Sequence, residues 1–178
     1  MGDSLITIVA IFLAAILMFV FPLMTLAERT DDISSLAVQT ATTEFVDGVR
    51  TTGQMTLTDY EQYLSDITST GNSFDVDVLI QQLDENPGVK TTQAEATKIG
   101  ENLYYNIYTT QVEDELYSKG RITLKEGDLV TVTAKNTNQT IAQLIRNFFY
   151  MITGNDSYQI VGQHSGVVTV NGVGSNQN

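Results

Sequence analysis

The sequence contains no cysteine and a single histidine, and these two absences exclude several classes of protein. Without cysteine there can be no disulfide, no thiol nucleophile and no cysteine-ligated zinc or iron–sulfur centre. With His164 alone, a histidine-based metal site or acid–base triad is not expected. Only nine basic residues stand against 21 acidic ones, for a net charge of −12, so a surface that neutralises nucleic-acid phosphates is not expected either. We therefore expect a protein that is not an enzyme and does not bind nucleic acid.

The most informative feature is an uncharged run of 23 residues, Leu5 to Ala27. As a helix this run would be roughly 34 Å long, enough to cross a bilayer core of about 30 Å. A cleaved secretory signal has a basic start and a shorter apolar core, but no Lys or Arg precedes Arg29. A buried core helix of this purity would be unusual in so small a domain. The run predicts a membrane-spanning helix, and residues 1–30 are expected to form a transmembrane and assembly helix.

The rest of the chain, residues 31–178, is expected to form an extracytoplasmic α+β head. Neither flank of the span has an excess of Lys or Arg, so the positive-inside rule gives little guidance to its orientation. Asp3 is the only charged residue before Glu28, and without it the net charge of −12 becomes −11. Such an acidic head is more easily placed outside the cell. We expect a single-pass protein of the cell membrane with its C-terminal head outside.

The pattern after the span predicts that the same helix continues as an amphipathic spine to about residue 52. Apolar and small residues recur there at steps of three and four, which is typical of a helix with one apolar stripe. A cap is expected at Thr51–Gly53, and Pro22 is expected to kink or loosen one turn. The predicted stripe consists of Ile33, Leu36, Ala37, Thr40, Ala41, Phe45 and Val49.

The head itself shows the periodicities of short helices and strands. Helices are predicted at 58–69, with Thr58 as its cap, and at 140–153, while residues 92–118 favour helix with strand as the open alternative. Strands are predicted at 74–80, in a hairpin over 121–135 turning at 126–128, and once or twice within 158–172. Residues 83–90 are predicted to be a loop and 174–178 a frayed tail. The expected fold class is α+β: a long N-terminal helix packed on a small antiparallel-sheet head with short helices.

No residue is assigned a catalytic or cofactor-binding role. His164 precedes Ser165, with Asp156 nearby in sequence, but adjacent members of a triad do not face one another, so His164 is interpreted as a lone turn histidine. The chain also lacks GxGxxG, GxxxxGK[ST] and HExxH motifs.

No metal site is predicted either. Asp75 and Asp77 fall on one strand face, and oxygen ligands follow at residues 84–86, a set that could hold Ca²⁺. No EF-hand-type loop is present, so a solvated polar strand face is favoured. The acidic run Glu113–Glu115 is expected on an exposed helix or turn. Two glycosylation sequons, at Asn138 and Asn155, are too short a pattern to be informative.

The whole layout resembles type IV pilin-like subunits, including the TadE-like and pseudopilin branches encoded by tight-adherence (Tad) clusters of the Firmicutes type. The residues that carry the resemblance are the apolar run with Pro22 inside it, the spine and short helix over residues 33–71, and the later segment GDLVTVTAKN. The resemblance is good over residues 1–80. It implies no cofactor and a structural role, in which apolar helices bundle to form a surface filament, the extracellular pilus.

Further expectations follow from that resemblance. In the family a prepilin peptidase removes a basic leader that ends in Gly, and a secretion ATPase with its platform drives assembly. This sequence has no basic residue before Gly2, and Asp3 is the only acid where the family carries a Glu. Asp3 either replaces that Glu and pairs with a neighbour's N-terminal amine, or is a membrane-interface acid. The alternative to a pilin is a membrane-anchored extracytoplasmic binding or assembly module that does not polymerise.

Overall fold

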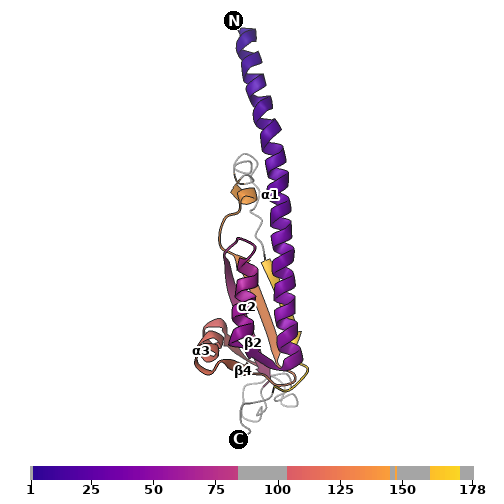
Figure 1. The fold of residues 1–178 in the computed structure, drawn as a ribbon, viewed down its shortest axis with the longest axis vertical. Coiled ribbons are helices and arrows are strands. Elements are labelled where there is room, and N and C mark those ends of the chain that lie inside the picture. The colour runs from indigo at the N-terminus through magenta and orange to yellow at the C-terminus, as the bar shows by residue number, and fades with distance from the viewer. Residues whose placement is uncertain (1, 84–103, 145–146, 148–160, 173–178) are drawn as a thin grey trace, which may run out of the picture.

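The computed structural model describes residues 2–83, 104–144, 147 and 161–172. It confirms the predicted α+β class, with one long helix packed along a small antiparallel-sheet head that also carries short helices (Figure 1). In chain order the elements are α1 (Gly2–Thr52), β1 (Gln54–Thr56), α2 (Leu57–Thr68), β2 (Phe74–Leu83), β3 (Tyr104–Tyr108), α3 (Thr109–Lys119), β4 (Arg121–Thr123), β5 (Leu129–Asn136) and β6 (Val161–Val167).

Helix α1 runs without interruption for 51 residues. At a rise of 1.5 Å per residue this is about 76 Å. The helix continues through Pro22 and Gly48 and ends at Thr52. Gly53 follows with φ of +66°, and its N–H donates to the carbonyl of Val49 at 2.9 Å, so a left-handed glycine closes the helix at the predicted cap. Figure 1 shows the N-terminal half of α1 projecting beyond the head and the C-terminal half lying along it.

The main sheet has four antiparallel strands in the order β3-β2-β5-β6. Side chains alternate along the central strand β5, where Val130, Val132 and Ala134 are buried while Thr131 and Thr133 are only half-buried. This alternation is the reason one face of the sheet accepts helices. The strand predicted at 74–80 is confirmed and extends to Leu83 as β2.

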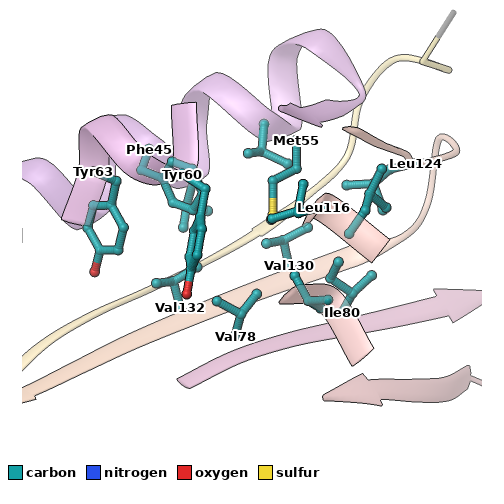
Figure 2. Packing of buried hydrophobic residues seen from close by; sticks show 14 of the residues in the cluster. Phe45, Met55, Tyr60, Tyr63, Val78, Ile80, Leu116, Leu124, Val130 and Val132 are labelled. Carbon is teal, nitrogen blue, oxygen red and sulfur yellow. The ribbon is translucent and has the colours of Figure 1, made fainter. Parts of the chain in front are cut away.

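The core lies between that face of the sheet and the helices (Figure 2). Phe45 of α1 stacks on Tyr63 of α2, with ring centroids 4.7 Å apart, and lies 6.2 Å from the ring of Tyr60. The sheet contributes Val78, Ile80, Val130 and Val132, and the end of the head nearest Gly53 contributes Met55, Leu116 and Leu124. Helix α1 therefore shares one hydrophobic core with the rest of the head.

The hairpin predicted over residues 121–135 is wrong. The turn exists, with Gly127 at φ of +96°, but β4 pairs with β1 in a separate two-stranded sheet, while β5 pairs with β2 and β6. Both edges of β5 are therefore occupied, which leaves β4 no place beside it. Pairing with β1 instead sets Met55 opposite Ile122, and both side chains are buried.

Three other local predictions need correction. Helix α2 begins at Leu57 and is capped by Thr56, whose hydroxyl oxygen accepts the backbone N–H of Asp59 at 3.1 Å, so Thr58 is not the cap. Within the segment for which helix was favoured, residues 104–108 form strand β3 and residues 109–119 form helix α3. The loop predicted at 83–90 is wrong at Leu83, which is the last residue of β2 and pairs with Tyr104. The rest of that loop and the prediction for residues 92–103 lie outside the described residues.

The C-terminal predictions are confirmed where the chain is described. Residues 141–144 and 147 are helical, and Val161–Val167 form one strand, β6. The remainder of the predicted helix to residue 153, residues 158–160 and the predicted tail lie outside the described residues.

Helix α1 lies unusually close to the edge strand β6. A Cβ on Gly162 would be 2.7 Å from Cγ1 of Val38, so only a glycine permits this approach. The side-chain amide of Gln39 donates to the carbonyl of Gln163 at 3.1 Å and accepts the N–H of the same residue at 3.3 Å. Part of the outer edge of β6 is therefore hydrogen-bonded to α1.

Candidate functional site: the exposed apolar surface of the long helix

The first half of α1 exposes an apolar surface on every side. The most apolar 18-residue stretch of the helix has none of its residues buried within the protein, and α1 is long and apolar enough to cross a membrane. A soluble monomer rarely exposes apolar patches larger than a few hundred Å². Lipid or other protein surfaces must therefore cover these side chains. The exposed large residues are Leu5, Ile6, Ile8, Val9, Ile11, Phe12, Leu13, Ile16, Leu17, Met18, Phe19, Phe21, Leu23 and Leu26.

Small residues interrupt this surface near its middle. Ala10, Ala14 and Ala15 are all exposed, and Ala10 and Ala14 lie one helical turn apart on the same side. Small residues at this spacing let the backbones of two membrane helices approach closely, which increases their van der Waals contact. This pair is the site on α1 best suited to helix–helix packing.

Asp3 lies in the first turn of α1, where a carboxylate interacts favourably with the helix dipole. Its backbone carbonyl accepts a hydrogen bond from the hydroxyl of Thr7 at 2.8 Å. The pairing of Asp3 with a neighbouring subunit stays a prediction.

The buried side of the spine differs from the predicted stripe. Ile33 and Leu36 are 70% and 69% exposed, whereas the buried residues are Asp31, Ser34, Val38, Thr42, Phe45, Val46 and Val49. The prediction was right for Phe45 and Val49, and in part for Ala41, which is half-buried and packs against the core. The physical reason is the close approach of β6 at Gly162, which fits the smaller side chains of Val38 and Thr42.

A separate apolar surface, which we call the spine stripe, consists of the exposed Ile33, Leu36 and Ala37 with the half-buried Ala41 at its border. These residues line an open groove of about 460 Å³ together with Thr40, Glu44 and Asp66. The spine stripe lies beyond the charged residues Glu28 and Arg29, so the apolar surface of α1 resumes after the end of the uncharged run.

His164 lies on strand β6, so its prediction as a turn residue is wrong. Its Nε2 is 3.6 Å from Oδ1 of Asp47, which also accepts a hydrogen bond from Nη1 of Arg50 at 2.8 Å. Ser165 points to the other face of the sheet, where its hydroxyl is 2.8 Å from that of Thr131. His164 and Ser165 therefore do not act together, and Asp156 lies outside the described residues.

The predicted polar strand face is confirmed at Asp75 and Asp77, which are exposed on β2. Nζ of Lys135 lies 3.4 Å from Oδ2 of Asp77. Within the described part of the chain, no group of three or more Asp, Glu or His side chains is placed to hold a metal. The oxygen ligands at residues 84–86 lie outside that part.

Asn138, in the first sequon, has a structural use for its side chain. Its Oδ1 accepts the N–H of Ser73 at 2.7 Å, and its Nδ2 donates to Oδ1 of Asn72 at 3.1 Å. A glycan would replace a hydrogen on that nitrogen. Asn138 therefore links the loop before β2 to the segment after β5, and Asn155 lies outside the described residues.

The acidic run at residues 113–115 lies in helix α3, one of the two predicted alternatives, but only Asp114 is exposed, while Glu113 and Glu115 are half-buried. Glu113, however, also contacts the core, because its Oε1 accepts a hydrogen bond from the hydroxyl of Tyr60 at 2.8 Å. Burial raises the pKa of Tyr60 far above its usual value, and the adjacent Glu113 carboxylate raises it further. Burial also raises the pKa of Tyr63, while its hydrogen bond with Thr42 lowers it. A single sequence gives no signal for these long-range pairs.

These shifts predict a loss of stability at alkaline pH. In the folded state the pKa values of Tyr60 and Tyr63 lie above the unfolded value of about 10. Below pH 10 both states keep these protons, so the free energy of unfolding is unaffected. As the pH rises above 10, the unfolded state loses its protons first, so the free energy of unfolding falls. Urea unfolding of the full chain in detergent, measured from pH 8 to 11.5, should show this decline. Replacing both Tyr60 and Tyr63 by Phe should flatten it, whereas the exposed control Tyr117→Phe should not. An equally steep decline in the double variant would contradict the assignment.

Comparison with family models, with curated proteins and with solved structures finds no match for this chain. The functional argument therefore rests on its own residues. Among those described, the extended apolar surface of α1 is the feature that requires a binding partner.

Proposed function

We propose that this protein is a non-enzymatic, pilin-like or pseudopilin structural subunit. Its N-terminal helix holds it in the cell membrane as a single-pass protein with the head outside, and copies assemble through that helix into a surface filament. A secretion ATPase with its platform, and a prepilin peptidase, are the machinery this function requires.

The observation that carries the proposal is the position of the spine stripe. Ile33 lies six residues past Ala27 and Leu36 lies nine residues past it, so they are roughly 9 and 14 Å beyond the end of the uncharged run. The headgroup region adds only about 5–8 Å to each side of the hydrocarbon core. The spine stripe thus lies above the lipid, where the surface of a neighbouring protein can cover it, and this position supports assembly along α1 over a simple membrane anchor.

The shape of the molecule supports self-association along α1. The helix is continuous from the apolar half to the end of the spine, so two copies that pack through residues 5–27 also bring their spines together (Figure 1). In a membrane the apolar half is solvated by lipid. In a filament outside the membrane, only other copies of the same helix can cover it.

The orientation can be tested with protease added to intact cells or protoplasts. The proposed topology places the head, with its net charge of −11, outside, so digestion should remove the residues beyond about 50 and leave a protected N-terminal fragment. Immunoblots against tags at either end distinguish the products. A head digested only after lysis would reverse the topology and contradict a surface filament.

A further inference from the structure

A helical turn of the head lies beside the end of the apolar run. Ile141 and Ala142, at its start, line a groove of about 420 Å³ together with residues of α1 that include Leu23, Leu26 and Thr30. Figure 1 shows this turn, in orange, beyond the end of the sheet and next to α1. It is therefore the part of the described head that reaches furthest toward the projecting half of α1.

The turn exposes its large apolar side chains and buries its smaller and polar ones. Ile141 and Leu144 are 70% and 53% exposed, while Ala142 and Gln143 are buried against the protein. Residues three apart lie on the same side of a helix, so Ile141 and Leu144 form one outward apolar surface.

Polar contacts fix the turn in this position. The hydroxyl of Thr140 donates to Oδ2 of Asp31 at 2.8 Å, and both residues are buried. Thr140 Oγ1 also accepts the N–H of Gln143 at 3.2 Å, and Gln143 Oε1 accepts the N–H of Thr140 at 3.1 Å, which is a capping box. These hydrogen bonds hold the turn against α1, so that Ile141 and Leu144 stay exposed in the folded protein.

The height of the turn determines what covers it. Its neighbours Leu23 and Leu26 belong to the uncharged run, and Leu23 lies five residues, or roughly 8 Å, inside the first charge at Glu28. Interfacial helices bury their apolar side about 5–10 Å into the boundary between headgroups and acyl chains. Ile141 is therefore at the depth where such residues meet lipid, and Leu144 lies on the same side of the turn, three residues further on.

We propose that Ile141 and Leu144 insert into the outer boundary of the bilayer, so that the head contacts the membrane at a second point beside α1. The occupant of this surface is phospholipid, at the junction of headgroups and acyl chains. The inference rests on the proposed membrane residence of α1, because only that places the turn at the bilayer surface. Two points of contact restrict rotation and tilt of the head until the subunit leaves the membrane.

The chain has no tryptophan, so a single introduced one reports alone. The full chain is reconstituted into phosphatidylcholine vesicles whose acyl chains are brominated near the headgroup, and fluorescence is compared with that in unbrominated vesicles. Test variants are Ile141→Trp and Leu144→Trp. Phe19→Trp is the reference inside the apolar run, and Tyr117→Trp, 60% exposed on α3, is the reference in the solvent.

Ile141→Trp and Leu144→Trp should lose fluorescence in brominated vesicles and emit at shorter wavelength than Tyr117→Trp. Quenching of Phe19→Trp alone would overturn this inference and leave the membrane residence of α1 intact. The inference would also be overturned if Ile141→Trp showed no bromine quenching but its emission moved to shorter wavelength as the protein density in the vesicles increased. A second copy, and not lipid, would then cover the turn. Absence of quenching in Phe19→Trp would overturn both the inference and the proposed membrane anchor.

Discussion

Replacing Ala14 by leucine should leave α1 inserted in the membrane and strongly reduce assembly. Ala14 is exposed and lies one turn from Ala10, so the pair permits two backbones to approach closely. Leucine is at least as favourable as alanine in a membrane span, so insertion and membrane levels should stay near those of the wild type. Its larger side chain holds the helices apart. Electron microscopy and sedimentation of the sheared surface fraction measure the loss of polymer.

Two further variants sharpen this test. Ile8→Leu changes neither volume nor hydrophobicity in the same run and should assemble normally. Leu36→Glu places a charge on the spine stripe at a residue 69% exposed, so it should leave the fold intact and reduce assembly as Ala14→Leu does. If wild-type protein forms no filament or higher assembly when expressed with its neighbouring genes, the pilin proposal fails. The membrane-anchored module that does not polymerise then becomes the preferred function.

Among the left-handed glycines that the structure describes, Gly53 is the one at which a change to alanine should destabilise the head most. A Cβ at Gly53 would lie 2.5 Å from the backbone N of Gly172 and even closer to the carbonyl oxygen of Val170. Backbone atoms cannot move aside as a flexible side chain can. The positive φ alone costs about 1 kcal/mol, and the forced separation of the two segments should raise the loss above about 3 kcal/mol.

Gly71→Ala is the matched control for that variant. Its φ of +81° carries the same conformational cost, but a Cβ there meets no atom within 4 Å. Urea unfolding followed by circular dichroism should give a loss of about 1 kcal/mol for Gly71→Ala. Equal losses for the two variants would show that the segment around residues 170–172 does not pack against Gly53 as described.

The long helix and the sheet could be predicted because their signals are local. An uncharged run of 23 residues and an alternating strand such as 74–80 need only neighbours in sequence to be recognised. The face that the spine buries depends instead on a strand more than a hundred residues later. Periodicity favoured Ile33 and Leu36, and only the glycine at position 162 decides that Val38 and Thr42 face the sheet.

The pairing of β1 with β4 could not be predicted for a similar reason. Each strand has three residues, too few for a periodic signal, and the sequence near residue 127 carries an equally good turn for a hairpin. The candidate site also has one part that could be predicted from the sequence and one that could not. Its apolar half follows from composition, whereas exposure of the spine stripe and of Ile141 depends on how the head packs.

The hydrogen bonds between Gln39 and β6 have a consequence for crowding. An unpaired sheet edge is a template on which another chain can add a strand, which is the first step of β-aggregation. Here a side-chain amide occupies both the N–H and the carbonyl of Gln163, in the manner of a neighbouring strand. In the proposed assembly, where subunits would be concentrated side by side in one membrane, this contact makes β6 less available for pairing with another sheet at Gln163. The helix proposed to mediate assembly thus also protects part of the neighbouring strand edge from β-aggregation.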